Sequence, residues 1–178
     1  MTELGAEGGD FRRLAVRELQ ALEEDILWTE KAHFSAAELH GWVNVTVGLG
    51  ATILAAVAAA AVVAEVGPWL PGVTALLAAV GSGVLTFLKP KDASGAHLYA
   101  GRRLGALRVK VRQAVHLDCN PALALAPAEL RSVVEDLAAE KASIDKDAPG
   151  TSGMVFKGAR RKIDAGHFEH AVADTPKS

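Results

Sequence analysis

The sequence has little of what a soluble globular domain usually contains. Aromatic residues make up only 5% of the chain, although half of the residues are hydrophobic. Alanine and glycine are abundant instead, and such small side chains suit closely packed membrane helices better than a soluble core. The formal net charge of −2 gives no general reason to expect a nucleic-acid partner. The single cysteine, Cys119, cannot form an internal disulfide, so no oxidising compartment is implied.

Charged side chains are missing from two consecutive stretches. None lies between Glu38 and Glu65, and none lies between Glu65 and Lys89. Because a soluble helix needs a polar face, these stretches predict two transmembrane helices, at 42–64 and 69–88, with a connector at 65–68. Each stretch is near the ~20 residues that a membrane crossing needs. The alternative is a soluble alanine-rich hairpin that is buried within an oligomer.

The residues that flank the two stretches predict the orientation of the hairpin. Trp42 and Trp69 lie where aromatic anchors at the membrane interface are expected. Lys89 and Lys91 directly follow the second stretch, whereas the connector holds no basic residue. By the positive-inside rule, both termini face the cytoplasm. The first forty residues carry many charges and no continuous apolar run, so we expect no cleavable signal peptide.

The rest of the chain shows helical periodicity. Residues 1–41 form an amphipathic helix that we expect to run into the first span with little interruption. Residues 89–147 form a cytoplasmic helical region, with one helix capped by Asp92 or Ser94 and another that begins near Pro127. Residues 148–178 hold a short helix, Met154 to about His170, and a tail. The predicted fold class is therefore all-α, an integral membrane hairpin with long amphipathic cytoplasmic helices before and after it.

Apolar residues at spacings of three and four define the inner faces of these helices. The predicted inner positions are Leu19, Leu22, Ile26, His33, Ala36 and His40, then Gly101, Leu104, Leu107 or Arg108, Val111 and Val115, then Leu130, Val133, Val134, Leu137 and Ile144.

A search for chemistry finds no enzyme signature. His33 and His40 share a helix face but lie seven residues apart, and a zinc site on one helix needs closer spacing and further ligands. His116 and Cys119 lack a third orienting group, so they do not predict a nucleophile. We expect no cofactor and no metal. Because imidazole titrates near neutrality, a pH-sensing role of His33, His40 or His97 stays open.

Basic residues crowd the helix that follows the second span. The simplest interpretation is a solvated face that also attracts anionic headgroups, and a nucleotide or RNA site is the less favoured alternative. Arg102 and Arg103 are candidate regulatory or cytoplasmic residues, together with the three histidines. The full set of basic residues on this helix is Arg102, Arg103, Arg108, Lys110 and Arg112.

Small and weakly polar residues form a stripe on each predicted span. Asn44, Gly48 and Thr52 do so on the first, and Gly81 and Ser82 on the second. Such a stripe permits tight helix packing and, in an oligomer, can line a narrow pore; the sequence leaves both open. The spans contain no charged residue, which argues against a proton-coupled transporter.

One set of features covers nearly the whole chain: the hairpin, Glu30-Lys31-Ala32-His33-Phe34, His97, Ala100-Gly101, Leu107-Arg108 and Phe156-Lys157-Gly158-Ala159-Arg160-Arg161-Lys162-Ile163-Asp164-Ala165-Gly166. In these features the chain resembles the SLATT family of bacterial two-transmembrane proteins, which are associated with SMODS nucleotidyltransferases and SLOG-type sensors. Leu104 departs from the pattern, because many relatives have an aromatic residue there.

The resemblance implies a membrane effector of a bacterial conflict or antiphage system that forms pores and causes cell suicide. Together with the small-residue stripes, it leads us to expect an oligomeric pore in the bacterial inner membrane, gated through the cytoplasmic helices. The expected partners are the lipid bilayer, further copies of the chain, and a nucleotide-signal-producing enzyme or sensor, with no direct nucleic acid. The alternative function is a non-conducting membrane anchor or scaffold that recruits a soluble partner.

Overall fold

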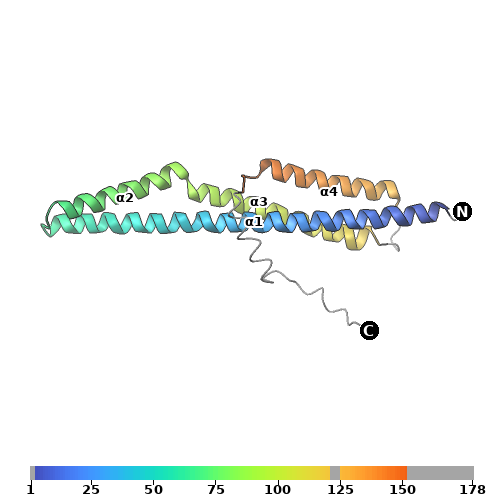
Figure 1. The fold of residues 1–178 in the computed structure, drawn as a ribbon, viewed down its shortest axis with the longest axis horizontal. Helices are drawn as coiled ribbons and strands as arrows, with labels where there is room; N and C mark the ends of the chain where they lie inside the picture. The colour runs from blue at the N-terminus through green and yellow to red at the C-terminus, as the bar shows by residue number, and fades with distance from the viewer. Residues whose placement is uncertain (1–2, 121–124, 152–178) are drawn as a thin grey trace, which may run out of the picture. The chain divides into compact units, whose positions relative to one another are not determined.

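A computed structural model of the chain describes residues 3–120 and 125–151, with side chains from residue 9 onward. Every regular element within these ranges is helical (Figure 1), which confirms the all-α class for them. The helix predicted for Met154 to His170 lies outside the described residues. The elements are α1 (Glu3–Val63), α2 (Trp69–Leu88), α3 (Pro90–Gln113), a π-helical turn η1 (Ala114–Asp118) and α4 (Pro127–Asp147).

Helix α1 runs without a break from the charged N-terminal region into the uncharged stretch. The uninterrupted helix predicted from the sequence is therefore confirmed. Its physical basis is simple, because no proline occurs before Pro68 to remove a backbone donor. The chain divides into two compact units, unit 1 (residues 1–35 and 98–178) and unit 2 (residues 36–97).

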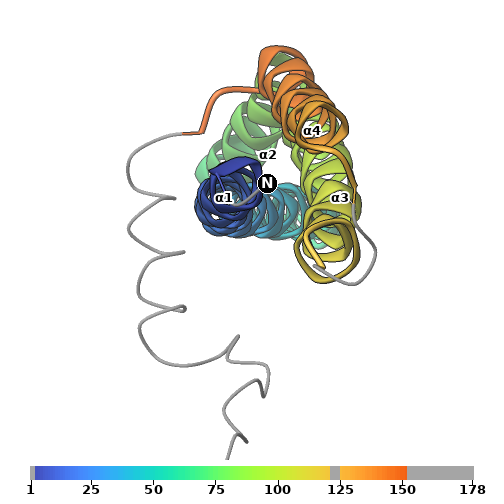
Figure 2. The ribbon, with the colours of Figure 1, turned by 90° about the vertical axis from the view of Figure 1, so that its right-hand side faces the viewer.

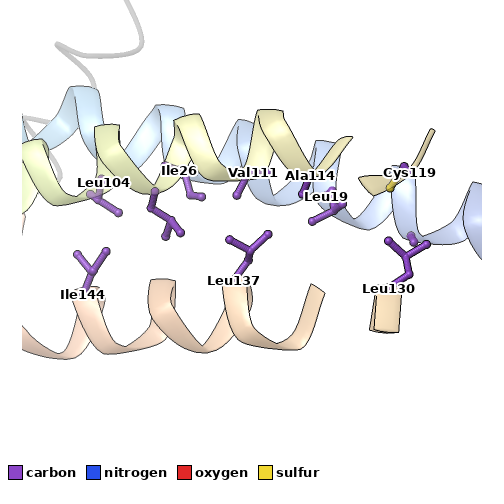
Figure 3. Close-up of a cluster of buried hydrophobic side chains, with 11 residues drawn as sticks. Leu19, Ile26, Leu104, Val111, Ala114, Cys119, Leu130, Leu137 and Ile144 are labelled. Atoms are coloured by element: carbon purple, nitrogen blue, oxygen red, sulfur yellow. The ribbon is translucent and has the colours of Figure 1, made fainter. Parts of the chain in front are cut away.

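Unit 1 is a bundle of the first part of α1, most of α3, and α4 (Figure 2). From α4, Leu130, Leu137 and Ile144 point toward side chains of α1 and α3, as Figure 3 shows. Their spacing of seven confirms the apolar face predicted for this helix. The full core comprises Ala15, Leu19, Ile26, Leu104, Leu107, Val111, Ala114, Cys119, Leu130, Leu137 and Ile144.

A side chain from α1 bonds to one residue after η1 and to one residue before α4. The Arg12 guanidinium donates to the carbonyl of Asn120 at 2.9 Å and to that of Leu125 at 3.1 Å. Helix α4 then begins with Pro127 in its first turn, as predicted. A Glu129 carboxylate oxygen accepts a hydrogen bond from the Ala126 amide at 2.9 Å, which satisfies one donor at the helix start.

Unit 2 contains the hairpin, and α1 ends there with two backbone hydrogen bonds. The Val66 amide donates to Ala61 at 3.0 Å, and the Glu65 amide donates to Val62 at 3.2 Å. This pair is the Schellman arrangement, in which the residue after the helix adopts a left-handed conformation. Glu65 occupies that position with φ of 53°, although glycine is the usual residue there.

A second left-handed residue, Lys89 with φ of 42°, separates α2 from α3. Helix α3 then begins at Pro90, so neither Asp92 nor Ser94 caps it, contrary to the prediction. Proline suits a first helical position because its missing N–H is not needed there. Asp92 instead lies in the first turn, and the Ser94 hydroxyl donates to the carbonyl of Ala37 on α1 at 2.7 Å.

Candidate functional site

The hairpin helices meet at two of the predicted small residues. A Cβ added to Gly81 would lie 3.0 Å from the Cβ of Ala51, and one added to Gly48 would lie 3.5 Å from Leu85 Cδ1. Figure 1 shows α2 beside the second half of α1, consistent with these contacts. Gly48 and Gly81 therefore let the two backbones approach closely.

The other members of the predicted stripe lie elsewhere. Thr52 and Ser82 are exposed, and Asn44 is half-buried. The five residues thus divide into a seam within one hairpin, formed by Gly48 and Gly81, and positions that a lipid or a second copy can reach. Whether any of them lines a pore stays a prediction.

The outer surface of the hairpin is apolar. Two helices of the described chain are long and apolar enough to cross a membrane. In the most apolar stretch of each helix, only 6% and 11% of the residues are buried. The central helix of a soluble protein would be mostly buried, because its apolar residues form the core.

The exposed threonine hydroxyls on this surface are satisfied without water. Thr46 donates to the carbonyl of Trp42 at 2.8 Å, Thr52 donates to Gly48 at 2.9 Å, and Thr86 donates to Ser82 at 2.9 Å. In hydrocarbon every polar group needs a partner within the protein. The threonines of the hairpin meet this requirement within their own helices.

The predicted anchors lie at the ends of the apolar stretches. The exposed fraction is 64% for Trp42 and 70% for Trp69. Lys89 and Lys91 are exposed as well, and neither makes an ion pair with the residues that the structure describes. These side chains are accessible to headgroups at an interface.

Two of the three singled-out histidines form a stacked pair in unit 2. The ring centroids of His40 and His97 are 5.6 Å apart, and the planes differ by 8°. His33 lies in unit 1, where burial lowers its pKa and the nearby Asp145 carboxylate partly opposes the shift. Among the described residues, no group of three or more potential ligands is positioned to hold a metal ion.

A charge cluster lies between α1 and α3 in unit 1. Arg108 lies against two carboxylates of α1, with Nε 3.5 Å from Glu23 Oε1 and Nη1 3.8 Å from Glu30 Oε2. Arg112 Nε is 3.9 Å from the same Glu23 oxygen. We call Glu23, Glu30, Arg108 and Arg112 the Glu30 cluster.

The centre of the Glu30 cluster is buried and incompletely hydrogen-bonded. The side chains of Glu30 and Arg108 are 10% and 23% exposed. Within the described part of the chain, Glu30 Oε2 and Arg108 Nε have no hydrogen-bond partner. Such atoms are uncommon in folded proteins and destabilise the state that buries them.

Glycines of α3 allow the close approach of α1. A Cβ on Gly101 would lie 3.1 Å from the Phe34 ring, and one on Gly105 would lie 3.6 Å from Glu30 Oε1. Together with Arg108, these glycines follow one ridge of α3 at spacings of four and three.

Several other basic residues pair with acids of α4 near the surface of the bundle. Arg103 Nη1 is 3.2 Å from Asp147, and Lys110 Nζ is 2.8 Å from Glu140. Arg102 is exposed and has no ion pair among the described residues. The predicted solvated basic face therefore describes Arg102, whereas Arg108 is turned toward α1.

Lys141 of α4 bridges to α1. Its Nζ lies 2.6 Å from Asp25 and 2.7 Å from Asp145. Burial alone would lower the pKa of Lys141, but the hydrogen bonds and charges of the two carboxylates outweigh it and raise the pKa. The ammonium therefore stays charged in the folded bundle.

Sequence reasoning missed the acidic half of the Glu30 cluster. A signal was present, because Glu23 and Glu30 are seven residues apart and share a helix face, as Arg108 and Arg112 do at a spacing of four. Complementary charges on two predicted helices indicate a pairing, but they do not say which helices meet.

Comparison of the chain with models of known protein families, with curated proteins and with solved structures gives no match. The resemblance to the SLATT family therefore stays a prediction.

Proposed function

We propose that this chain is an integral membrane protein whose hairpin crosses the bacterial inner membrane twice, with both termini in the cytoplasm. The observation that carries this proposal is the exposure of the apolar stretches of the two hairpin helices. The self-satisfied threonines of the hairpin support it, because they need no water. The placement of Lys89 and Lys91 after α2, with no basic residue in the connector, supports the orientation.

We further propose that several copies assemble into a pore that acts as a defence effector and is gated through unit 1. Two helices cannot enclose a conduit, so conduction requires an oligomer. Thr52 and Ser82 are exposed on the hairpin and supply weakly polar positions for such a lining. The resemblance to the SLATT family supports the effector role and a partner that produces or senses a nucleotide signal.

A cysteine-accessibility experiment tests the pore. Thr52→Cys, in a Cys119→Ala background, is reconstituted in liposomes and treated with a membrane-impermeant cationic thiol reagent. We expect the reagent to react and to reduce ion flux, because Thr52 would face water in the pore. Ile53→Cys is the matched control: Ile53 is the next residue, is 53% exposed, and would face lipid. Absence of flux under activation, or equal reactivity of the two cysteines, would contradict the pore.

The membrane anchor is the second candidate function. It is favoured by the separate core of unit 1, which gives the cytoplasmic helices a stable surface for a soluble partner. An anchor predicts that the Thr52 variants recruit the partner normally and that no condition produces flux. Co-purification of the partner with the hairpin intact, alongside flux measurements, separates the two functions.

A further inference from the structure

The Glu30 cluster lies between α1 and α3 in unit 1, and it combines buried charge with incomplete hydrogen bonding. We propose that this cluster is a latch: it holds α1 against α3 in the resting chain, and its separation accompanies activation. The proposal rests on the proposed function in so far as unit 1 is taken to gate the hairpin.

Burial is what makes this contact a candidate for a two-state element. Charges that pair in a low-dielectric site lose their hydration, and the pairing compensates for this loss only when every polar atom has a partner. Glu30 Oε2 and Arg108 Nε lack hydrogen-bond partners among the described residues. Separation of the helices would hydrate both atoms. The closed arrangement therefore carries the free-energy cost of two buried polar atoms without hydrogen bonds, which the open arrangement avoids.

The other ion pairs of α3 do not have this property. In the pair of Lys110 with Glu140, the side chains are 54% and 41% exposed. Exposed pairs of this kind contribute little because water and salt screen them. The apolar core supports the contacts of α3 with both neighbours, through Leu137 and Ile144 of α4 and through Leu19 and Ile26 of α1. The polar contact of α3 with α1 is therefore the one that changes in charge and hydration would disrupt first.

Close packing next to the cluster makes its separation an all-or-none event. Gly101 and Gly105 admit Phe34 and Glu30 at short distance, so the ridge of α3 fits α1 in one register. Packed interfaces of this kind change between discrete arrangements rather than deforming gradually. A broken Glu30–Arg108 contact is thus expected to release this part of α3 together, not one side chain at a time.

Opposite kinds of substitution distinguish a latch from an ordinary structural contact. Glu30→Gln leaves Arg108 with Glu23 as its remaining carboxylate, and Arg108→Gln leaves Glu30 with Lys31, whose Nζ is 3.4 Å from Glu30 Oε1, within its own helix. Each variant removes the ion pair between Glu30 of α1 and Arg108 of α3, which should favour the open state. The double variant Glu30→Met with Arg108→Met removes both charges and both unpartnered atoms and replaces them with flexible apolar side chains, which should favour the closed state. Glu140→Gln is the matched control, because it breaks the exposed ion pair between Lys110 of α3 and Glu140 of α4.

The distance between α1 and α3 is measured directly. Spin labels on Gln20→Cys and Gln113→Cys, both exposed positions, report it by pulsed electron resonance on the full chain in nanodiscs, in the Cys119→Ala background. We expect a short distance in the resting chain and in the Glu140→Gln control. Each single Gln variant should increase the population at a longer distance at least tenfold. The double Met variant should show the short distance alone.

Retention of the resting distance by both single Gln variants would overturn the latch, and so would opening of the double Met variant. If one single variant fails to fold, the other still decides the first of these outcomes. Ion flux is recorded on the same samples. Opening of α1 from α3 without flux supports the latch and contradicts the pore, whereas flux without opening contradicts the latch and supports the pore.

Discussion

The tightest contact in the hairpin makes a quantitative prediction about Gly81. A Cβ at this position would lie 3.0 Å from Ala51 Cβ and 3.7 Å from Val47 Cγ1, so a larger side chain has no room unless α2 moves away from α1. Gly83 lies two residues further along the same helix, and a Cβ there would meet nothing within 4 Å. The two glycines form a matched pair that differs in packing.

Gly81→Leu and Gly83→Leu both gain the helix propensity that glycine lacks, so this gain cancels in their comparison. Only Gly81→Leu overpacks the seam, and overpacking of a close contact typically costs about 1–3 kcal/mol. We therefore expect the free energy of separating the hairpin helices to be about 1–3 kcal/mol lower for Gly81→Leu than for Gly83→Leu.

The assay follows the hairpin in mixed micelles as the fraction of denaturing detergent is raised. Fluorophores on cysteines introduced at Thr46 and Thr86, in the Cys119→Ala background, report the separation of α1 and α2 by energy transfer. Gly81→Leu should lose energy transfer at a lower detergent fraction than Gly83→Leu, while far-ultraviolet circular dichroism stays helical for both. Equal midpoints would refute the packing argument.

Three further predictions concern single residues outside this seam. Gly101→Ala should destabilise unit 1 by about 1–3 kcal/mol in thermal unfolding, because its Cβ would lie 3.1 Å from the Phe34 ring. Phe34→Leu should restore part of this loss. Gly95→Ala is the control and should not lower the stability, because a Cβ there meets nothing within 4 Å. Glu65→Gly should stabilise the hairpin by about 1 kcal/mol in the detergent titration, because glycine adopts the left-handed conformation without strain; an unchanged midpoint would contradict this. Burial lowers the pKa of His33 below 6.5, so the unfolded chain binds the proton more readily and the stability of unit 1 should fall as the pH drops through 6.5. His33→Gln should flatten that dependence in unfolding curves taken across this pH range, and a wild-type curve that is already flat would contradict the assignment.

The limits of sequence reasoning are clearest on α3. The period of its apolar residues predicted Leu104, Leu107 and Val111 as inner positions, and all three are buried. The same pattern left Leu107 and Arg108 as alternatives, because they are adjacent on the helix. The structure resolves this choice by burying Leu107 in the core and placing Arg108 against Glu30, a residue far away in the sequence. A helix period identifies a face but does not identify what that face meets.

The prediction of the cap of α3 was wrong for a related reason. Asp92 and Ser94 have side chains that suit helix caps, so the sequence predicted a later start than Pro90. The chain turns at the left-handed Lys89, so α3 begins directly after it, earlier than predicted. The Ser94 hydroxyl donates a hydrogen bond to α1 instead of capping α3. A hydroxyl can satisfy a local amide or a distant carbonyl, and only the packed structure selects between them.

The sequence by itself determined the bounds of α2 and the break that separates it from α1. That information is local: missing charges define the apolar stretches, and prolines with glycines interrupt the helix between them, so α2 spans the predicted residues 69–88. The tertiary structure alone decided which side chains meet, namely Gly81 with Ala51, His40 with His97, and Glu30 with Arg108. These contacts join residues that are distant in the chain. Which of them form depends on how closely the helix backbones approach, and that distance is set by the positions of the glycines and of the buried charges.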